Sequence, residues 1–137
     1  MPLTKKVILT DKAPKPISVL NQGLIVGDMV YCSGQIGADP DTGKLVDGTV
    51  QDRTVSKPCL RPANEPGTDY ISQAQILKNL SAVLEAGGSS MANAVKVNVF
   101  LTDMADFAAM NEIYEKAFPD PKPVSSCCCT FSEAAGC

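Results

Sequence analysis

Few side chains in this chain can do chemistry, and one absence narrows the choice at once. The 137 residues include no histidine, which excludes a Ser-His-Asp triad, a Cys-His pair and any metal site ligated by imidazole. Chemistry must therefore use hydroxyls, thiols, carboxylates, arginine or backbone groups. Ser33-Gly34-Gln35 offers a hydroxyl and a glycine amide at the end of an expected strand. It is either a ligand-facing element or a strand end with a glycine bulge.

The six cysteines are the second candidate set. Cys32 stands among apolar residues, which is typical of a small buried hydrophobe rather than of a nucleophile without a base. Cys127, Cys128 and Cys129 are adjacent, so they lack the spaced pairs that tetrahedral zinc needs. We therefore expect no metal site.

Composition excludes two classes of partner. Lys and Arg number 12 against 15 Asp and Glu, a net charge of −3, and no basic stripe is present to neutralise nucleic-acid phosphates. No apolar run approaches the ~20 residues that a membrane helix needs. The first ten residues resemble neither a secretory signal nor a transit peptide. We expect no nucleic-acid or membrane partner and a cytoplasmic location, with the mitochondrion as the alternative.

The elements that must position these residues follow an α+β pattern. Apolar and β-branched runs predict strands over 7–9, 23–26, 29–33 and 95–101, with a two-residue turn at Gly27-Asp28. Apolar residues three and four apart predict two helices, one over 73–86 ended by Gly87-Gly88 and one with its stripe over 107–117. The segments 55–72 and 124–137 show no periodicity, and we predict no strand after Phe118.

Four stretches together resemble the RidA/YjgF (reactive intermediate deaminase) family: residues 21–23, 30–36, 77–88, and 95–104 followed by 107–114. The resemblance implies a chorismate-mutase-like fold, an antiparallel-rich mixed sheet with two helices on one face, here with the last strands missing. It also implies a homotrimer with clefts between subunits. Such proteins hydrolyse short enamines and imines to 2-oxo acids and ammonia without a metal or other cofactor.

The same resemblance carries over to individual residues. Ser33 and Gly34 match the family's Ser-Gly pair, Asn111 matches its helix asparagine, and Cys127 is in register with its cysteine. Ser125 stands where the family has its substrate-binding arginine, Leu20 stands at its tyrosine position, and its glutamate-bearing last strand has no match. Arg53 and Arg61 lie in no matching motif. We therefore expect impaired imine hydrolysis, or alternatively a non-catalytic ligand-binding or interaction protein.

The two aperiodic segments suggest a common origin. We expect one RidA-like domain over residues 1–123, interrupted by the proline-rich insertion 55–73, and a tail over 124–137 outside the family pattern. Both segments begin with Val-Ser, and removing 55–73 restores a continuous family helix in frame. A retained intron explains the insertion, with a genuine loop as the alternative, and an intron or a frameshift explains the tail. On this hypothesis the product is inactive and its trimer doubtful.

Overall fold

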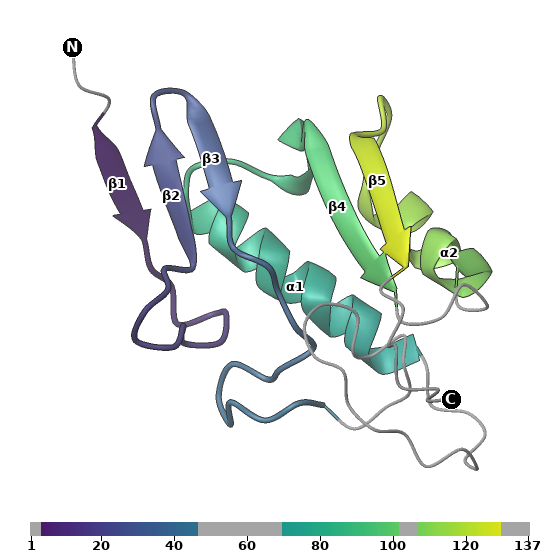
Figure 1. Ribbon diagram of the computed structural model, residues 1–137, viewed down its shortest axis with the longest axis horizontal. Coiled ribbons are helices and arrows are strands. Elements are labelled where there is room, and N and C mark those ends of the chain that lie inside the picture. The colour runs from purple at the N-terminus through teal and green to yellow at the C-terminus, as the bar shows by residue number, and fades with distance from the viewer. Residues whose placement is uncertain (1–3, 47–69, 102–106, 130–137) are drawn as a thin grey trace, which may run out of the picture.

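The chain forms five strands and two α-helices in the residues that the structure describes. The computed structural model describes residues 4–46, 70–101 and 107–129, and their side chains except those of 70–73 and 128–129. The strands are β1 (Lys5–Ile8), β2 (Gly23–Val26), β3 (Met29–Cys32), β4 (Lys96–Leu101) and β5 (Val124–Cys129), and the helices are α1 (Tyr70–Ala86), the 3-10 turn η2 (Met91–Asn93) and α2 (Phe107–Ala117). Figure 1 shows α1 and α2 together behind the strands, so the predicted α+β class with helices on one face is confirmed.

The N-terminal sheet is an antiparallel meander in the order β1-β2-β3. The two-residue turn between β2 and β3 forms as predicted, with Gly27 at φ 60°, a conformation that glycine adopts without strain. Gly23 begins β2 opposite Cys32 in a tight contact, because a Cβ at Gly23 would lie 2.8 Å from the carbonyl oxygen of Tyr31. β1 begins two residues earlier than predicted and ends one residue earlier, since its backbone pairs at Lys5–Ile8 and Leu9 is exposed.

Both predicted helices form, and one is longer than expected. α1 begins at Tyr70 rather than 73, so its first turn overlaps the predicted insertion; residues 55–69 lie outside the described part of the chain. It ends as predicted at Gly87-Gly88, where Gly88 has φ 79° and the amide of Ser89 donates to the carbonyl of Leu84 at 2.9 Å. No helix among the described residues is long and apolar enough to span a membrane.

The C-terminal segment corrects a prediction. We expected no strand after Phe118, yet β5 pairs in parallel with β4, in register from Lys96 opposite Val124 to Leu101 opposite Cys129. Val-Ser-Ser-Cys-Cys-Cys lacks the alternation of a half-buried strand, so side-chain pattern could not reveal it. Backbone pairing defines this strand instead, beginning with the amide of Val124, which donates to the carbonyl of Val95 at 2.9 Å. One of the strands that we expected to be missing is therefore present.

The apolar core has two separate parts. One cluster joins α1 to the meander and contains the buried residues Ile8, Ala13, Ala82 and Val83. The other joins α2 to β4 and contains Val99, Leu101 and Met110. Each sheet is thus packed on a helix with its own buried cluster.

Candidate functional site

A groove between β3 and β4 has a volume of about 1060 Å³. Its walls are the two strands, and its floor is the apolar face of α1, formed by Ile76, Leu77, Leu80 and Leu84. Ser33, Gly34 and Gln35 line it where the chain leaves β3. We call this cavity the β3–β4 groove.

Ser33 is held by two contacts to the segment before β2. Its amide donates to the carbonyl of Gln22 at 3.0 Å, and its hydroxyl donates to the carbonyl of Asn21. The serine proton is therefore engaged, and the hydroxyl oxygen presents its lone pairs to any further partner. Gln35 turns back along the same loop, and its side-chain amide donates to the carbonyl of Ser33 at 3.1 Å.

Gln22 fixes the segment that accepts the Ser33 contacts. Its side chain is buried, with 3% exposed, and its amide nitrogen donates to the carbonyls of Thr10, Ala13 and Pro14 at 2.9, 3.2 and 3.0 Å. Its oxygen accepts from the amide of Thr10 at 2.7 Å. All hydrogen-bonding groups of this buried amide have partners, so the loop before β2 is anchored rather than loosely packed.

Asn79 anchors the loop that follows Ser33, and sequence reasoning missed it. This fully buried α1 residue donates to the carbonyls of Ile36 and Ala38 at 3.1 and 2.9 Å. Its oxygen accepts from the side chain of Gln75 at 2.8 Å. The signal was available, because position 79 lies three residues after Ile76 and four before Val83, on the apolar stripe of the helix.

The charges at the groove are few. Among the described residues that line it, Asp28 and Lys96 are the charged ones. Burial raises the pKa of the Cys32 thiol above its ordinary value, so this cysteine stays protonated at neutral pH and packs as a small hydrophobe, as predicted. Farther along the loop, the backbone amide of Thr42 donates to the carboxylate of Asp39 at 2.8 Å and lowers its pKa. By accepting this hydrogen bond, the Asp39 side chain stabilises the turn that follows it.

The remaining predicted site residues do not line the groove. Asn111 is exposed on α2, and Cys127 is exposed on β5. Ser125, in the place of the family arginine, is also exposed on β5, opposite Val97. Of the predicted site residues, Ser33 and Gly34 therefore line the groove, whereas Asn111 and Cys127 lie on the surface outside it.

The two remaining expectations concern the arginines and a metal site, and the structure bears on them only within the described residues. Arg53 and Arg61 lie outside them, so the structure places neither arginine. Within 4–46, 70–101 and 107–129, no group of three or more His, Cys, Asp or Glu is arranged to hold a metal ion. What the described arrangement can do is hold a small polar ligand through hydroxyl, amide and backbone groups beside an apolar floor.

Known proteins resemble this chain in sequence and in structure. The family model described as Endoribonuclease L-PSP matches residues 10–57 and 63–131. A RutC family protein of Pyrococcus horikoshii is 40% identical over 119 residues, 87% of this chain and 79% of the relative. The 2-iminobutanoate/2-iminopropanoate deaminase of Rattus norvegicus is 37% identical over 121 residues, 88% of this chain and 74% of the relative.

A solved structure shares the fold at similar identity. RidA from the Antarctic bacterium Psychrobacter sp. PAMC 21119 is 32% identical, with a TM-score of 0.74 over 96% of this chain and 90% of that chain. The family model leaves residues 58–62 of this chain unmatched, and these residues fall inside the segment 55–73. With the family match covering most of the sequence and with these relatives, the chain belongs to the RidA/YjgF family.

Proposed function

We propose that this chain binds short 2-imino acids such as 2-iminobutanoate and hydrolyses them to 2-oxo acids and ammonia, with a turnover that its own substitutions reduce. Family membership and the name of the rat relative support the class of reaction. The observation that carries the proposal is the fixed Ser33-Gly34 corner at the groove, held through Asn21, Gln22 and Asn79. A corner held in this way can position a ligand without reorganising when the ligand arrives.

The chemistry needs little from the protein. Water adds to the carbon of the C=N bond while the nitrogen gains a proton, and the resulting carbinolamine loses ammonia to leave a carbonyl group. Ser33 can orient this water, because its hydroxyl donates to the carbonyl of Asn21 and its lone pairs can accept from the water. Asn111 lies on the surface of α2 outside this groove, so its amide would reach the ligand only from a neighbouring copy of the chain, as the homotrimer implied by the family resemblance would allow.

The reduced turnover follows from the substrate's carboxylate. A guanidinium holds a carboxylate through two parallel hydrogen bonds, whereas Ser125 offers one neutral hydroxyl on the exposed strand β5. Losing one partner of a desolvated charged pair costs about 2 to 5 kcal/mol. We therefore expect weak binding of the imino acid and slow hydrolysis.

The test restores the anchor. Threonine dehydratase supplies 2-iminobutanoate in the assay, and release of the 2-oxo acid is followed above the spontaneous rate. Ser125 does not line the groove of its own chain, so an arginine there reaches a ligand in the groove only from a neighbouring copy. We expect weak acceleration by the chain, a gain of about tenfold or more in kcat/KM for Ser125→Arg in a sample that sediments as an oligomer, and no gain for Ser126→Arg, its neighbour on the same strand. Ser33→Ala should lower the activity of both the original chain and the Ser125→Arg variant.

Two outcomes would contradict the proposal. Rapid turnover by the original chain that Ser125→Arg leaves unchanged would show that another group binds the carboxylate. Failure of the original chain and of Ser125→Arg to accelerate hydrolysis, with both folded, would favour the alternative of a non-catalytic ligand-binding or interaction protein. The cytoplasmic or mitochondrial location stays a prediction.

A further inference from the structure

Three aliphatic side chains are exposed on the turn that precedes β2. Ile17, Val19 and Leu20 are 67%, 81% and 54% exposed. The amide of Leu20 donates to the carbonyl of Ile17 at 2.9 Å, which closes the turn. Large aliphatic groups exposed side by side are typical of a surface that contacts something apolar. We call residues 17–20 the aliphatic turn.

The aliphatic turn belongs to a segment whose two ends are tied together. The buried side-chain amide of Gln22, which follows the turn, donates to the carbonyls of Ala13 and Pro14, which precede it, at 3.2 and 3.0 Å. The turn is therefore held in place before any ligand arrives. A surface that is already ordered loses little conformational entropy on binding.

The aliphatic turn ends beside Ser33. The residue after Leu20 is Asn21, whose carbonyl accepts from the hydroxyl of Ser33. Because consecutive Cα atoms are about 3.8 Å apart, Leu20 is a close neighbour of the group that holds this hydroxyl. Figure 1 shows the loop between β1 and β2 at the same end of the meander as the end of β3. None of the three aliphatic residues lines the β3–β4 groove, so a ligand meets them where it extends past Ser33.

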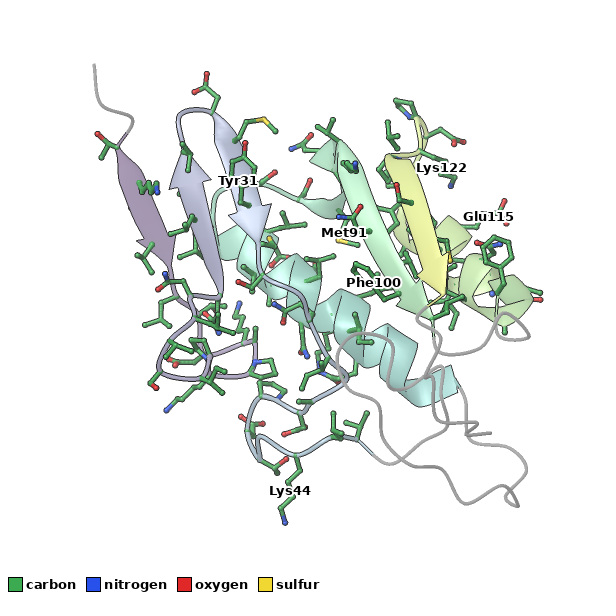
Figure 2. All side chains as sticks on the ribbon, in the orientation of Figure 1. Tyr31, Lys44, Met91, Phe100, Glu115 and Lys122 are labelled. Atoms are coloured by element: carbon green, nitrogen blue, oxygen red, sulfur yellow. The ribbon has the colours of Figure 1, made fainter. Side chains whose placement is uncertain are left out.

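The charges of the described residues lie away from this end of the groove. The charged lining residues, Asp28 and Lys96, lie where β3 and β4 begin, and these strands run in the same direction, so Ser33 is at the opposite end. Lys44, on the loop after Ser33, points away from the strands (Figure 2). The charged residues of the loop between β1 and β2 precede the turn, at positions 11, 12 and 15. An apolar surface of this kind suits the uncharged part of a ligand better than its carboxylate.

We propose that the aliphatic turn, through Leu20, makes this site select 2-imino acids with branched aliphatic side chains over 2-iminopropanoate, whose side chain is a methyl group. The imino carbon lies at Ser33, and the aliphatic side chain of the substrate extends past Ser33 onto the turn. Leu20 determines specificity and takes no part in the chemical step. This inference rests on the proposed function for the class of ligand.

The experiment measures binding of the stable 2-oxo acids, so it does not depend on turnover. The probes are 2-oxopropanoate and 4-methyl-2-oxopentanoate, which share the carboxylate and the carbonyl group and differ in the side chain. Their dissociation constants for the full chain are obtained from NMR chemical-shift titrations. We expect 4-methyl-2-oxopentanoate to bind about fivefold or more tightly, because its additional carbons leave water on the turn.

Three variants assign the preference to Leu20. Leu20→Ser should bring the two dissociation constants to within about twofold of each other, whereas Leu20→Met keeps an apolar side chain and should keep the preference. Leu9→Ser is the matched control, because Leu9 is a leucine 71% exposed at the end of β1, and it should also keep the preference. Each substituted position is more than half exposed, so the fold tolerates the change.

The outcomes separate this inference from the proposed function. Equal binding of the two oxo acids by the original chain, binding of neither, or a preference that Leu20→Ser leaves intact would each overturn the inference. Loss of the preference in Leu9→Ser would overturn it as well. A preference that depends on Leu20, in a chain that does not accelerate imine hydrolysis, would support the selective surface and contradict the proposed function.

Discussion

Asn79 is the residue on which the position of the Ser33 loop most depends. It is fully buried and connects α1 to the carbonyls of Ile36 and Ala38. Removing the side chain leaves the buried carbonyl of Ala38 and the partly buried carbonyl of Ile36 without their donor, and a buried group without a partner costs about 1 to 3 kcal/mol. We expect Asn79→Ala to lower the free energy of unfolding by about 2 to 4 kcal/mol in urea denaturation.

The matched control is the next residue. Lys78 is exposed on the same helix, so Lys78→Ala should change the free energy of unfolding by about 0.5 kcal/mol or less. Equal effects of the two substitutions would show that the Asn79 hydrogen bonds do not hold the loop.

Cys32 offers a pH-dependent test of burial. Its pKa lies above the ordinary value of 9.0 because burial disfavours the thiolate. Since the folded state has the higher pKa, burial of the neutral thiol stabilises the fold fully below 9.0, and this contribution is lost as the pH rises above that value. The thiolate is the form that alkylating reagents attack.

We therefore expect iodoacetamide to modify Cys32 about tenfold or more slowly than the exposed Cys127 in the native protein at mildly alkaline pH. Peptide mass mapping distinguishes the two sites. The difference should disappear in concentrated urea, and equal rates in the native protein would be inconsistent with burial of Cys32.

The elements differ in how far sequence pattern could predict them. The β2–β3 hairpin and α2 were predictable because turn chemistry and apolar spacing act over a few residues. β5 was not, because its Val-Ser-Ser-Cys-Cys-Cys sequence has no alternation and its pairing with β4 joins distant parts of the chain. The candidate site divides similarly: the strand end at Ser33 and Gly34 was predictable from local sequence, whereas the site roles of Ser33, Gly34, Asn111 and Cys127 rest on family resemblance.

Gly23 provides a test of how closely β2 packs. A Cβ there would lie 2.8 Å from the backbone carbonyl oxygen of Tyr31 and 3.1 Å from a methyl group of Val83. Gly23→Ala should therefore destabilise the protein by about 1 to 3 kcal/mol, the usual cost of overpacking. Gly27→Asn is the control, because its Cβ would meet nothing within 4 Å and asparagine tolerates the positive φ. A chemical denaturation series that ranks the two variants equally would contradict this packing.

At the scale of the whole molecule, the exposed strand edges bear on association. Within residues 4–46, 70–101 and 107–129, the edges of β3 and β4 that flank the β3–β4 groove pair with no other strand, and unprotected edges promote contacts between chains. The outer face of the strands also exposes Met29, Tyr31 and Phe100. The family resemblance implies a homotrimer, but we expect this chain by itself to sediment as a broad distribution. A single species at three times 14.4 kDa in analytical ultracentrifugation would refute this expectation.

The division of the core into two clusters has a consequence for how the fold is lost. One cluster belongs to the β1-β2-β3 sheet and the other to the β4-β5 sheet, so the described part of the chain has two halves. α1 contacts β3 in one half and α2 in the other. Cooperative melting requires that damage in one half be transmitted to the other, and α1 contacts elements of both halves. The meander and the β4–β5 pair thus behave as neighbouring foldons whose concerted opening is governed by α1.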